Sequence, residues 1–308
     1  MTGETKVPGG QGEPLTNNVH GCALVFEGGG YRGAYTAGMV NLLLERGIFF
    51  DYACGISAGS SHTINYVSRD QTRVHMAFLA IDGAEPVGGF GSFLRGRGYF
   101  NADYLYRGCI RDDFCGFAWD TFCANPARIR IQAFDAASGE SATFTKQDMP
   151  DVWRMIDCVR ASSTVPIAMK PLPIDGRTYF DGGLGTGAGL PLHLAEQDGH
   201  ERFVMLATRP AGYRKQPVTP VQRAVFGRLL GRWPHVLEAT LTRPERYNAE
   251  LDRIAQIERE GRALVIRPDT MPVSNGTLDT AELQRAYVMG HEQLERELPR
   301  LLEFVGLS

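Results

Sequence analysis

The sequence predicts an α/β protein of three layers, in which helices cover both faces of a mostly parallel central sheet. Short, continuous apolar runs that are typical of buried strands alternate with longer segments of helical periodicity. The chain has 308 residues, of which 43% are hydrophobic and 22% charged, so it is long enough for a large core. The strand-like runs are CALVF (22–26), FFDYACG (49–55), RIRIQAFDA (128–136), RFVMLATRP (202–210) and RALVIRPDT (262–270).

Each expected element has its own local signal. A helical pattern over 31–46 follows the first strand, and a second helix begins near Ser57. The segment KPLPIDGRTYFDGG (170–183) predicts a hairpin, because Asp175-Gly176 is a favoured two-residue turn, and the hairpin brings Asp181 to the end of its second strand. Near the end of the chain, Asp279 and Glu282 occupy the N-cap and capping-box positions of an amphipathic helix.

Composition excludes several classes of function. The formal net charge of −3 gives no reason to expect nucleic acid as a partner, and no apolar run is long enough to span a bilayer. The six cysteines form no C-x-x-C pair, which argues against a metal site and favours reduced, buried thiols. The first eighteen residues contain no apolar core of a signal peptide, so we expect a polar N-terminal arm and a cytoplasmic protein.

Two segments are candidates for contact with a membrane at its inner face. The Gly-rich segment 82–98 has the composition of a mobile flap. Residues 211–246 hold seven Arg or Lys against two acids, interleaved with apolar side chains at helical spacing. A solvated basic helix is the plainer interpretation of this second segment, and a lipid-facing surface is the alternative.

The segment EGGGYRG (27–33) joins the first strand to the first helix and permits two interpretations. Gly28, Gly30 and Gly33 fit the G-x-G-x-x-G pattern of a nucleotide-binding loop. The same bare backbone also suits an oxyanion hole. A dinucleotide site needs an acidic residue at the end of the second strand, but Asp51 lies at the start of that strand.

The end of the second strand carries a different motif. Gly55-Ile56-Ser57-Ala58-Gly59 is a G-x-S-x-G sequence between a strand and a helix, where flanking glycines permit a tight turn that exposes the serine hydroxyl. The helix N-terminus that follows favours a developing oxyanion. A hydrolase explains both motifs together, because adjacent parallel strands present their carboxyl ends at one edge of the sheet.

The order of these motifs resembles the patatin-like phospholipase family, whose three signatures correspond here to GGGYRG, GISAG and DGG (181–183). The resemblance covers residues 22 to about 208 and predicts a catalytic domain over 21–208, preceded by the arm at 1–20. Residues 209–308 resemble a variable, mostly helical extension. Because the strand-like ALVIRPD lies within this extension, we expect the extension to pack on the same sheet.

The resemblance implies a Ser-Asp dyad without cofactor or metal, in which Ser57 is the nucleophile and Asp181 the general base. It implies an oxyanion hole from the amides of Gly29 and Gly30, with Gly28 as a third candidate. Arg32 is then either a ligand for a substrate phosphate or a support for the loop. The remaining motif glycines are Gly33, Gly55, Gly59, Gly182 and Gly183.

A carboxylate of ordinary pKa is a weak base for a serine, so we expect burial to raise the pKa of Asp181. His193, His200, His235 and His291 follow Ser57 in the chain order of a Ser-His-Asp triad, but none lies in a recognisable loop motif, and His62 is expected on a helix surface. The sequence thus predicts a lipid acyl hydrolase acting on carboxylic esters. The alternative is a catalytically weak protein of the same fold that binds phospholipid or nucleotide.

Overall fold

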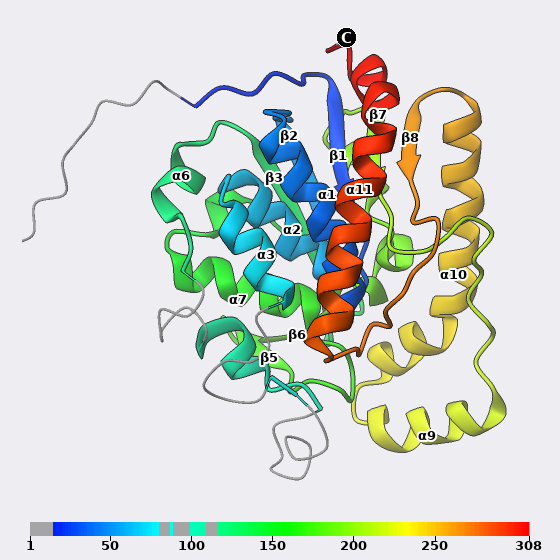
Figure 1. Ribbon diagram of the computed structural model, residues 1–308. Helices are drawn as coiled ribbons and strands as arrows, with labels where there is room; N and C mark the ends of the chain where they lie inside the picture. The colour runs from blue at the N-terminus through cyan, green and yellow to red at the C-terminus, as the bar shows by residue number, and fades with distance from the viewer. Residues whose placement is uncertain (1–14, 80–86, 89–98, 109–115, 308) are drawn as a thin grey trace, which may run out of the picture.

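The computed structural model describes residues 15–79, 87–88, 99–108 and 116–307, and within them eight strands form one sheet (Figure 1). The strand order is β5-β6-β3-β2-β1-β7-β8, and β4 pairs with β3 outside this path. Strands β1, β2, β3, β7 and β8 run parallel, whereas β4, β5 and β6 pair antiparallel. The strands are β1 Cys22–Phe26, β2 Tyr52–Ile56, β3 Arg128–Asp135, β4 Ser141–Phe144, β5 Leu172–Ile174, β6 Arg177–Asp181, β7 Arg202–Leu206 and β8 Ala263–Ile266. The predicted mostly parallel sheet is confirmed.

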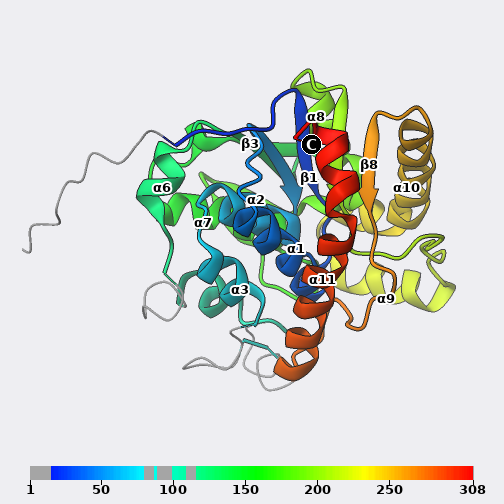
Figure 2. The ribbon, with the colours of Figure 1, turned by 45° about the horizontal axis from the view of Figure 1, so that its top comes forward.

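Helices cover both faces of the sheet, which gives the predicted three layers (Figures 1 and 2). The α-helices are α1 Gly33–Glu45, α2 Ala58–Val67, α3 Gln71–Leu79, α6 Trp119–Ala124, α7 Val152–Ser163, α8 Leu192–Gln197, α9 Pro220–Leu230, α10 Pro234–Arg259 and α11 Thr280–Val305. Short 3₁₀ turns are η1 Gly30–Arg32, η3 Lys146–Asp148, η4 Gly182–Leu184 and η5 Thr186–Gly189, and η2 Tyr104–Gly108 is a π-helix.

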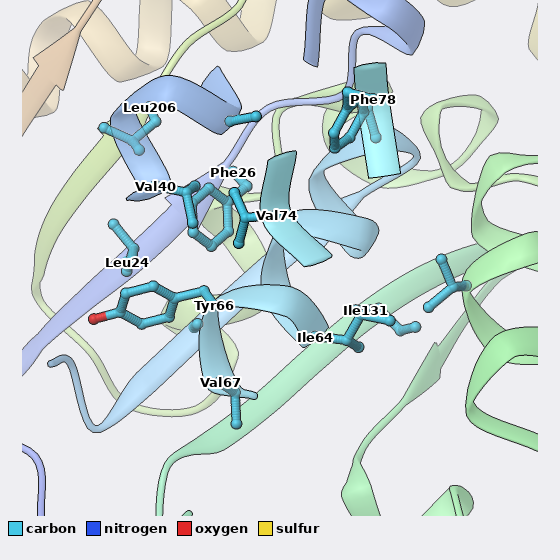
Figure 3. Packing of buried hydrophobic residues seen from close by; sticks show 14 of the residues in the cluster. Leu24, Phe26, Val40, Ile64, Tyr66, Val67, Val74, Phe78, Ile131 and Leu206 are labelled. Carbon is cyan, nitrogen blue, oxygen red and sulfur yellow. The ribbon is translucent and has the colours of Figure 1, made fainter. Parts of the chain in front are cut away.

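The strands are buried on both faces because their alternate side chains enter different clusters. In β1, Leu24 and Phe26 join the cluster under α1, α2, α3 and α11, whereas Ala23 and Val25 join the cluster under α8 and α10. Figure 3 shows part of the larger cluster, in which Phe26 lies with Val40 from α1 and Val74 from α3. This two-sided burial explains why the strands appear as continuous apolar runs.

The C-terminal segment belongs to this same architecture. Strand β8 extends the sheet beside β7, and α11 packs along α1 (Figure 1). The two helices cross at glycines, since a Cβ on Gly290 would lie 1.9 Å from the carbonyl oxygen of Tyr35. The predicted N-cap of α11 is confirmed, because the Asp279 side chain accepts the Glu282 N–H at 2.8 Å.

Several expectations differ from the structure or lie outside it. The helix expected over 31–46 begins as the turn η1 before α1, and the basic stretch 211–246 splits into α9 and the start of α10. Val19 is buried and bridges Phe50, so the expected N-terminal arm is tied to the domain before residue 20. Residues 1–14 of that arm and all of segment 82–98 except 87–88 lie outside the described residues.

Candidate active site

Ser57 occupies the turn between β2 and α2. Its backbone has φ 57° and ψ −124°, a left-handed conformation that is strained for a residue with a side chain. The turn is closed tightly, because a Cβ on Gly55 would lie 2.1 Å from the carbonyl oxygen of Gly59. A Cβ on Gly59 would in turn lie 2.2 Å from the Phe26 carbonyl oxygen of β1. The two motif glycines therefore hold α2 against the sheet and fix the serine at its edge.

The register of the sheet brings Asp181 level with this serine. Ile56 of β2 pairs with Gln132 of β3, and the next residue of β3, Ala133, pairs with Asp181 at the end of β6. Since β6 runs antiparallel to β3, the hairpin returns the carboxylate to the height of Ser57, with one strand between them. Gly182 is required here because a Cβ would lie 2.0 Å from the Gln132 carbonyl oxygen.

A direct hydrogen bond joins the two side chains. The Ser57 hydroxyl donates to Asp181 Oδ2 at 2.7 Å, and the Gly183 N–H donates to Asp181 Oδ1 at 2.7 Å. Ser57 and Asp181 are both buried, with 8% and 5% of their surface exposed. Burial raises the pKa of Asp181, as expected, although Arg243, the Ser57 hydroxyl and the Gly183 N–H act in the opposite direction. A serine hydroxyl held on a carboxylate of raised pKa is arranged for proton transfer.

The Gly-rich loop after β1 lies next to this serine. A Cβ on Gly28 would be 3.3 Å from Ser57 Cβ, and a Cβ on Gly29 would be 2.9 Å from the Thr208 side chain. Gly30 has φ +55°, and a Cβ there would be 2.5 Å from the Asn275 carbonyl oxygen. A Cβ at Gly29 or Gly30 would therefore approach its neighbours too closely, whereas one at Gly28 would be tight and would require them to shift by a few tenths of an ångström.

The amides of this loop are not equivalent. The Gly28 N–H already donates to the Gly189 carbonyl at 3.0 Å, so it is engaged within the fold. The N–H groups of Gly29 and Gly30 have no acceptor among the described residues. The Ser57 N–H is engaged as well, by Ser162 Oγ at 2.9 Å. The loop therefore offers two amide donors beside the serine rather than three.

Arg32 follows this loop and is 7% exposed. It forms no salt bridge within the described part of the chain, and its buried Nε has no hydrogen-bond partner there. The pKa of Arg32 is lowered to about 10, first by burial and then by Arg209, with Glu27 acting in the opposite direction. The remaining motif glycine, Gly33, begins α1 against the ring of Phe78.

No histidine contacts the serine or the aspartate within the described residues. His62 is fully buried, contrary to the expectation of a helix surface, because it packs on Phe78 and shares a 2.7 Å hydrogen bond with Thr36. His193 Nε2 bonds to Gln132 Oε1 at 2.9 Å. The other late histidines lie elsewhere: His200 contacts Arg128, His291 contacts Glu45, and His235 is exposed.

The hydrogen-bonded pair of Ser57 and Asp181 opens into a cavity of about 220 Å³. One part of its wall is apolar and comes from α2, α3, η2 and α7, with Met76, Phe78, Leu105, Ile156 and Met169 among its side chains. Another part carries the cations of Arg32, Arg209, Lys215 and Arg243, and Arg73 of α3 is a fifth cationic side chain in the lining. The sequence did not predict Arg73, Arg209, Lys215 or Arg243 as site residues, because nothing in the local pattern distinguishes an inward cation from an outward one.

The described residues contain no cluster of His, Cys, Asp and Glu that could hold a metal ion. The described cysteines are free, and of these Cys22, Cys54 and Cys158 are buried, whereas Cys123 is exposed. Cys109 and Cys115 lie outside the described residues. None of the described helices is both long and apolar enough to cross a membrane.

Comparison with known proteins gives two matching family models. The model of the patatin-like phospholipases matches residues 24–195, and the model of a domain of unknown function, DUF6363, matches residues 233–306. A curated relative is the uncharacterized protein YjjU of Escherichia coli, 25% identical over 200 residues, which are 61% of this chain and 52% of that protein. The chain thus spans about half the length of this relative.

Among solved structures, VipD from Legionella pneumophila is similar. The superposition covers 91% of this chain and 67% of the VipD chain, with a TM-score of 0.46 and 14% sequence identity.

Proposed function

Because the chain belongs to the patatin-like phospholipase family, as the match over residues 24–195 shows, we propose that it is a serine lipid acyl hydrolase that cleaves carboxylic esters. The observation that carries this proposal is the 2.7 Å hydrogen bond from Ser57 to Asp181, inside a cavity that the Gly-rich loop also lines. Ser57 is the nucleophile and Asp181 the general base.

In the first half of the reaction, the acyl group moves to the enzyme. The Asp181 carboxylate takes the hydroxyl proton of Ser57 while Oγ attacks the ester carbonyl carbon. The carbonyl oxygen becomes an oxyanion, which accepts hydrogen bonds from the N–H groups of Gly29 and Gly30. The C–O bond to the alcohol then breaks, and the protonated Asp181 gives its proton to the leaving oxygen. The free alcohol and an acyl-serine remain.

In the second half, water replaces the alcohol. Asp181 accepts a proton from the water, and the water oxygen attacks the acyl carbon. The bond from that carbon to Ser57 Oγ breaks, Oγ recovers a proton from Asp181, and a fatty acid leaves. Because Asp181 must both accept and return a proton, the raised pKa of this carboxylate supports the role.

The apolar wall of the cavity supports a fatty acyl chain as the substrate group on one side of the dyad. Side chains from α3, η2 and α7 cover this wall, including Phe78, Leu105 and Ile156. Burial of a hydrocarbon chain against such side chains is favourable at about 0.8 kcal/mol per methylene group.

A membrane surface is proposed as the place where the enzyme meets its lipid. Val221, Val225 and Leu229 of α9 lie at i, i+4 and i+8, and 74%, 46% and 48% of their surfaces are exposed. Arg223 and Arg228 on the same helix are exposed as well. An exposed apolar stripe beside cations suits an anionic bilayer.

The last two arginines of the basic stretch 211–246 do not take part in this surface. Arg243 and Arg246 of α10 donate to the backbone carbonyls of Ala188 and Gly185, and thus point into the protein. Co-sedimentation with vesicles tests the role of α9. We expect binding to anionic vesicles that salt weakens, and that Val225→Glu and Arg228→Glu reduce. If the protein co-sediments equally with neutral and anionic vesicles, or if both variants co-sediment as well as the wild type, α9 is not part of the interface.

A serine-directed organophosphonate separates catalysis from mere binding. We expect one adduct per chain by intact mass, which Ser57→Ala abolishes, together with release of fatty acid from p-nitrophenyl and lipid esters by the wild-type protein only. The competing hypothesis is a regulatory protein that binds phospholipid or nucleotide without turnover. Binding of such a ligand without an adduct or fatty acid release would favour that hypothesis and contradict ours.

A further inference from the structure

The described residues contain a second cavity, of about 180 Å³, between α10 and the carboxyl ends of β7 and β8. Its apolar lining belongs to the cluster under α8 and α10, whereas the apolar wall beside the dyad belongs to the cluster on the other face of the sheet. Neither Ser57 nor Asp181 lines this second cavity, which we call the α10 cavity. Its larger apolar side chains are Leu190, Met205, Leu251, Ile254 and Val265. In other proteins, an apolar space of about 150 Å³ is enough to hold a small hydrocarbon.

Residues 209–214 form one side of the α10 cavity. This segment follows β7 and contains no helix or strand. Side chains fasten its end to α10. The Arg214 guanidinium donates to the Asn248 carbonyl at 2.8 Å and pairs with Asp252, and the Lys215 N–H donates to Asn248 Oδ1 at 2.9 Å. An irregular segment, rather than a helix or a strand, thus separates this side of the cavity from its surroundings.

Four charged side chains line the α10 cavity, and two of them already have an opposite charge as partner. These four are Glu27, Arg209, Arg214 and Arg267. Arg214 pairs with Asp252, and Arg267 Nη2 lies 2.8 Å from Glu258 Oε2. Both pairs lie within the described part of the chain, so these two arginines are neutralised by α10 itself.

Arg209 differs from the other two arginines. It forms no salt bridge with a carboxylate of the described residues, and its buried Nε has no hydrogen-bond partner among them. Its guanidinium stacks on the Tyr213 ring at 4.1 Å. The one carboxylate in the lining is engaged, since Glu27 accepts the Thr208 N–H at 2.6 Å and the Tyr247 hydroxyl at 2.5 Å. The α10 cavity therefore combines an apolar interior with one guanidinium that can accept an anion.

We propose that the α10 cavity is a second binding site, which takes a carboxylic acid with a hydrocarbon tail, the carboxylate on Arg209 and the tail among the apolar side chains. A single carboxylate matches a single guanidinium, which can donate two parallel hydrogen bonds to it. The tail gains by leaving water for the apolar interior. A hydrocarbon without the acid group would leave Arg209 without an anion.

Arg209 also lines the cavity of the dyad, so it connects the two sites. An acid bound in the α10 cavity neutralises one of the cations beside Ser57. The oxyanion of the transition state then forms in a less positive environment, which lowers kcat. The proposed hydrolysis releases an acid of this class, so the α10 cavity responds to the product. The binding site goes beyond the proposed function, and only this effect on kcat rests on it.

Calorimetric titration with octanoate tests the site without turnover. Ala255 of α10 lines the cavity, whereas Ala249 of the same helix is exposed. We expect Ala255→Phe, which fills the cavity, to weaken octanoate binding at least about tenfold, and the matched control Ala249→Phe to keep it. Octanol should bind about tenfold more weakly than octanoate, and Arg209→Gln should remove that difference. If Ala255→Phe does not fold, Ala255→Leu fills less of the cavity and serves the same purpose.

Inhibition of p-nitrophenyl ester hydrolysis by octanoate tests the connection. Octanoate bound beside the dyad competes with the ester and raises only the apparent KM. Octanoate in the α10 cavity should in addition lower kcat roughly 2- to 10-fold, less than the loss of a direct oxyanion donor. Ala255→Phe should lose the effect on kcat, and Ala249→Phe should retain it.

The outcomes separate this site from the proposed function. Equal octanoate binding by the wild type and a folded Ala255 variant refutes the site and leaves the esterase standing. Equal binding of octanol and octanoate refutes the role of Arg209. Octanoate binding in the α10 cavity of a protein without turnover supports the site and refutes the esterase. Purely competitive inhibition of an active enzyme refutes the connection through Arg209.

Discussion

Replacing Asp181 by asparagine separates the proposed chemistry from the packing. Asparagine has nearly the same shape and can still accept the Gly183 N–H that binds Asp181 Oδ1. It cannot take a proton from Ser57, whose hydroxyl donates to Oδ2. Because no histidine of the described residues reaches either side chain, no imidazole in that part of the chain is placed to replace the carboxylate.

The expected loss of kcat follows from the rate enhancement that one general base contributes. Such a base typically contributes about 10²- to 10⁴-fold, which corresponds to about 2.7–5.4 kcal/mol of transition-state stabilisation. We therefore expect Asp181→Asn to lower kcat on a soluble p-nitrophenyl ester by at least about 10²-fold. His193→Ala should keep most of the activity, because its ring bonds to Gln132 and not to the dyad.

The same variant should be more stable than the wild type at neutral pH. The folded-state pKa of Asp181 is raised above the ordinary value of 3.8 for an aspartate, so ionised Asp181 destabilises the fold above the folded pKa, and the effect is absent below pH 3.8. Thermal melts should thus give Asp181→Asn a higher Tm at pH 7, with a difference that shrinks as the pH falls.

The matched control is Asp135→Asn in neighbouring β3. Asp135 is also buried, accepts backbone N–H groups and pairs with Arg177, but it does not contact Ser57. This variant should keep kcat. A folded Asp181→Asn variant with more than a tenth of the wild-type kcat would refute the dyad. A His193→Ala loss equal to that of Asp181→Asn would restore the Ser-His-Asp triad.

Three further changes test the surroundings of the dyad. Arg243→Gln should move the acid limb of the pH profile of kcat/KM to higher pH, because Arg243 lowers the pKa of Asp181. Arg243→Lys should move the limb back. An acid limb at the same pH in all three proteins would contradict this coupling. Gly29→Val places a Cβ 2.9 Å from Thr208. If the Gly29 amide binds the oxyanion, this variant should lower kcat on a soluble ester by about 10²- to 10³-fold. An unchanged kcat in a folded variant removes the Gly29 amide from the mechanism. Gly59→Ala should lower the Tm, because its Cβ would lie 2.2 Å from the Phe26 carbonyl oxygen. The control Gly227→Ala, in exposed α9, should not lower the Tm, because its Cβ meets no atom within 4 Å. Equal Tm values for the two variants would show that α2 can shift freely.

Local signals were sufficient for most of the fold. The apolar runs gave five parallel strands, since strands buried on both faces show no alternation, and Asp175-Gly176 gave the hairpin, in which both turn residues have positive φ. Strand β4 was missed because SATF is short and mostly unburied, so that its pairing with β3 comes from the tertiary structure. The burial of His62 was missed for a similar reason, because the Phe78 ring that covers it belongs to a different helix.

The candidate site could be predicted only where a motif constrains the backbone. Gly55 and Gly59 are needed by a turn, and such needs are visible in sequence. The backbone at Arg209, Lys215 and Arg243 needs no particular residue type, so no sequence motif marks these positions. Their inward direction depends on how α10 and the segment after β7 pack against the loop that carries Arg32, which no local pattern encodes.

Unfavourable features gather in this one cavity. Ser57 has a strained φ, Asp181 is a buried acid with a raised pKa, and four cations lack carboxylate partners among the described residues. Each feature costs folding free energy, and the apolar clusters on both faces of the sheet offset that cost. A fold selected for stability alone would not concentrate such costs beside one serine, whereas the proposed ester hydrolase needs them, because the strain exposes the proposed nucleophile and the raised pKa of Asp181 suits proton transfer. The C-terminal segment therefore contributes to the walls of this cavity as well as to the sheet, because Arg209, Lys215 and Arg243 line the cavity.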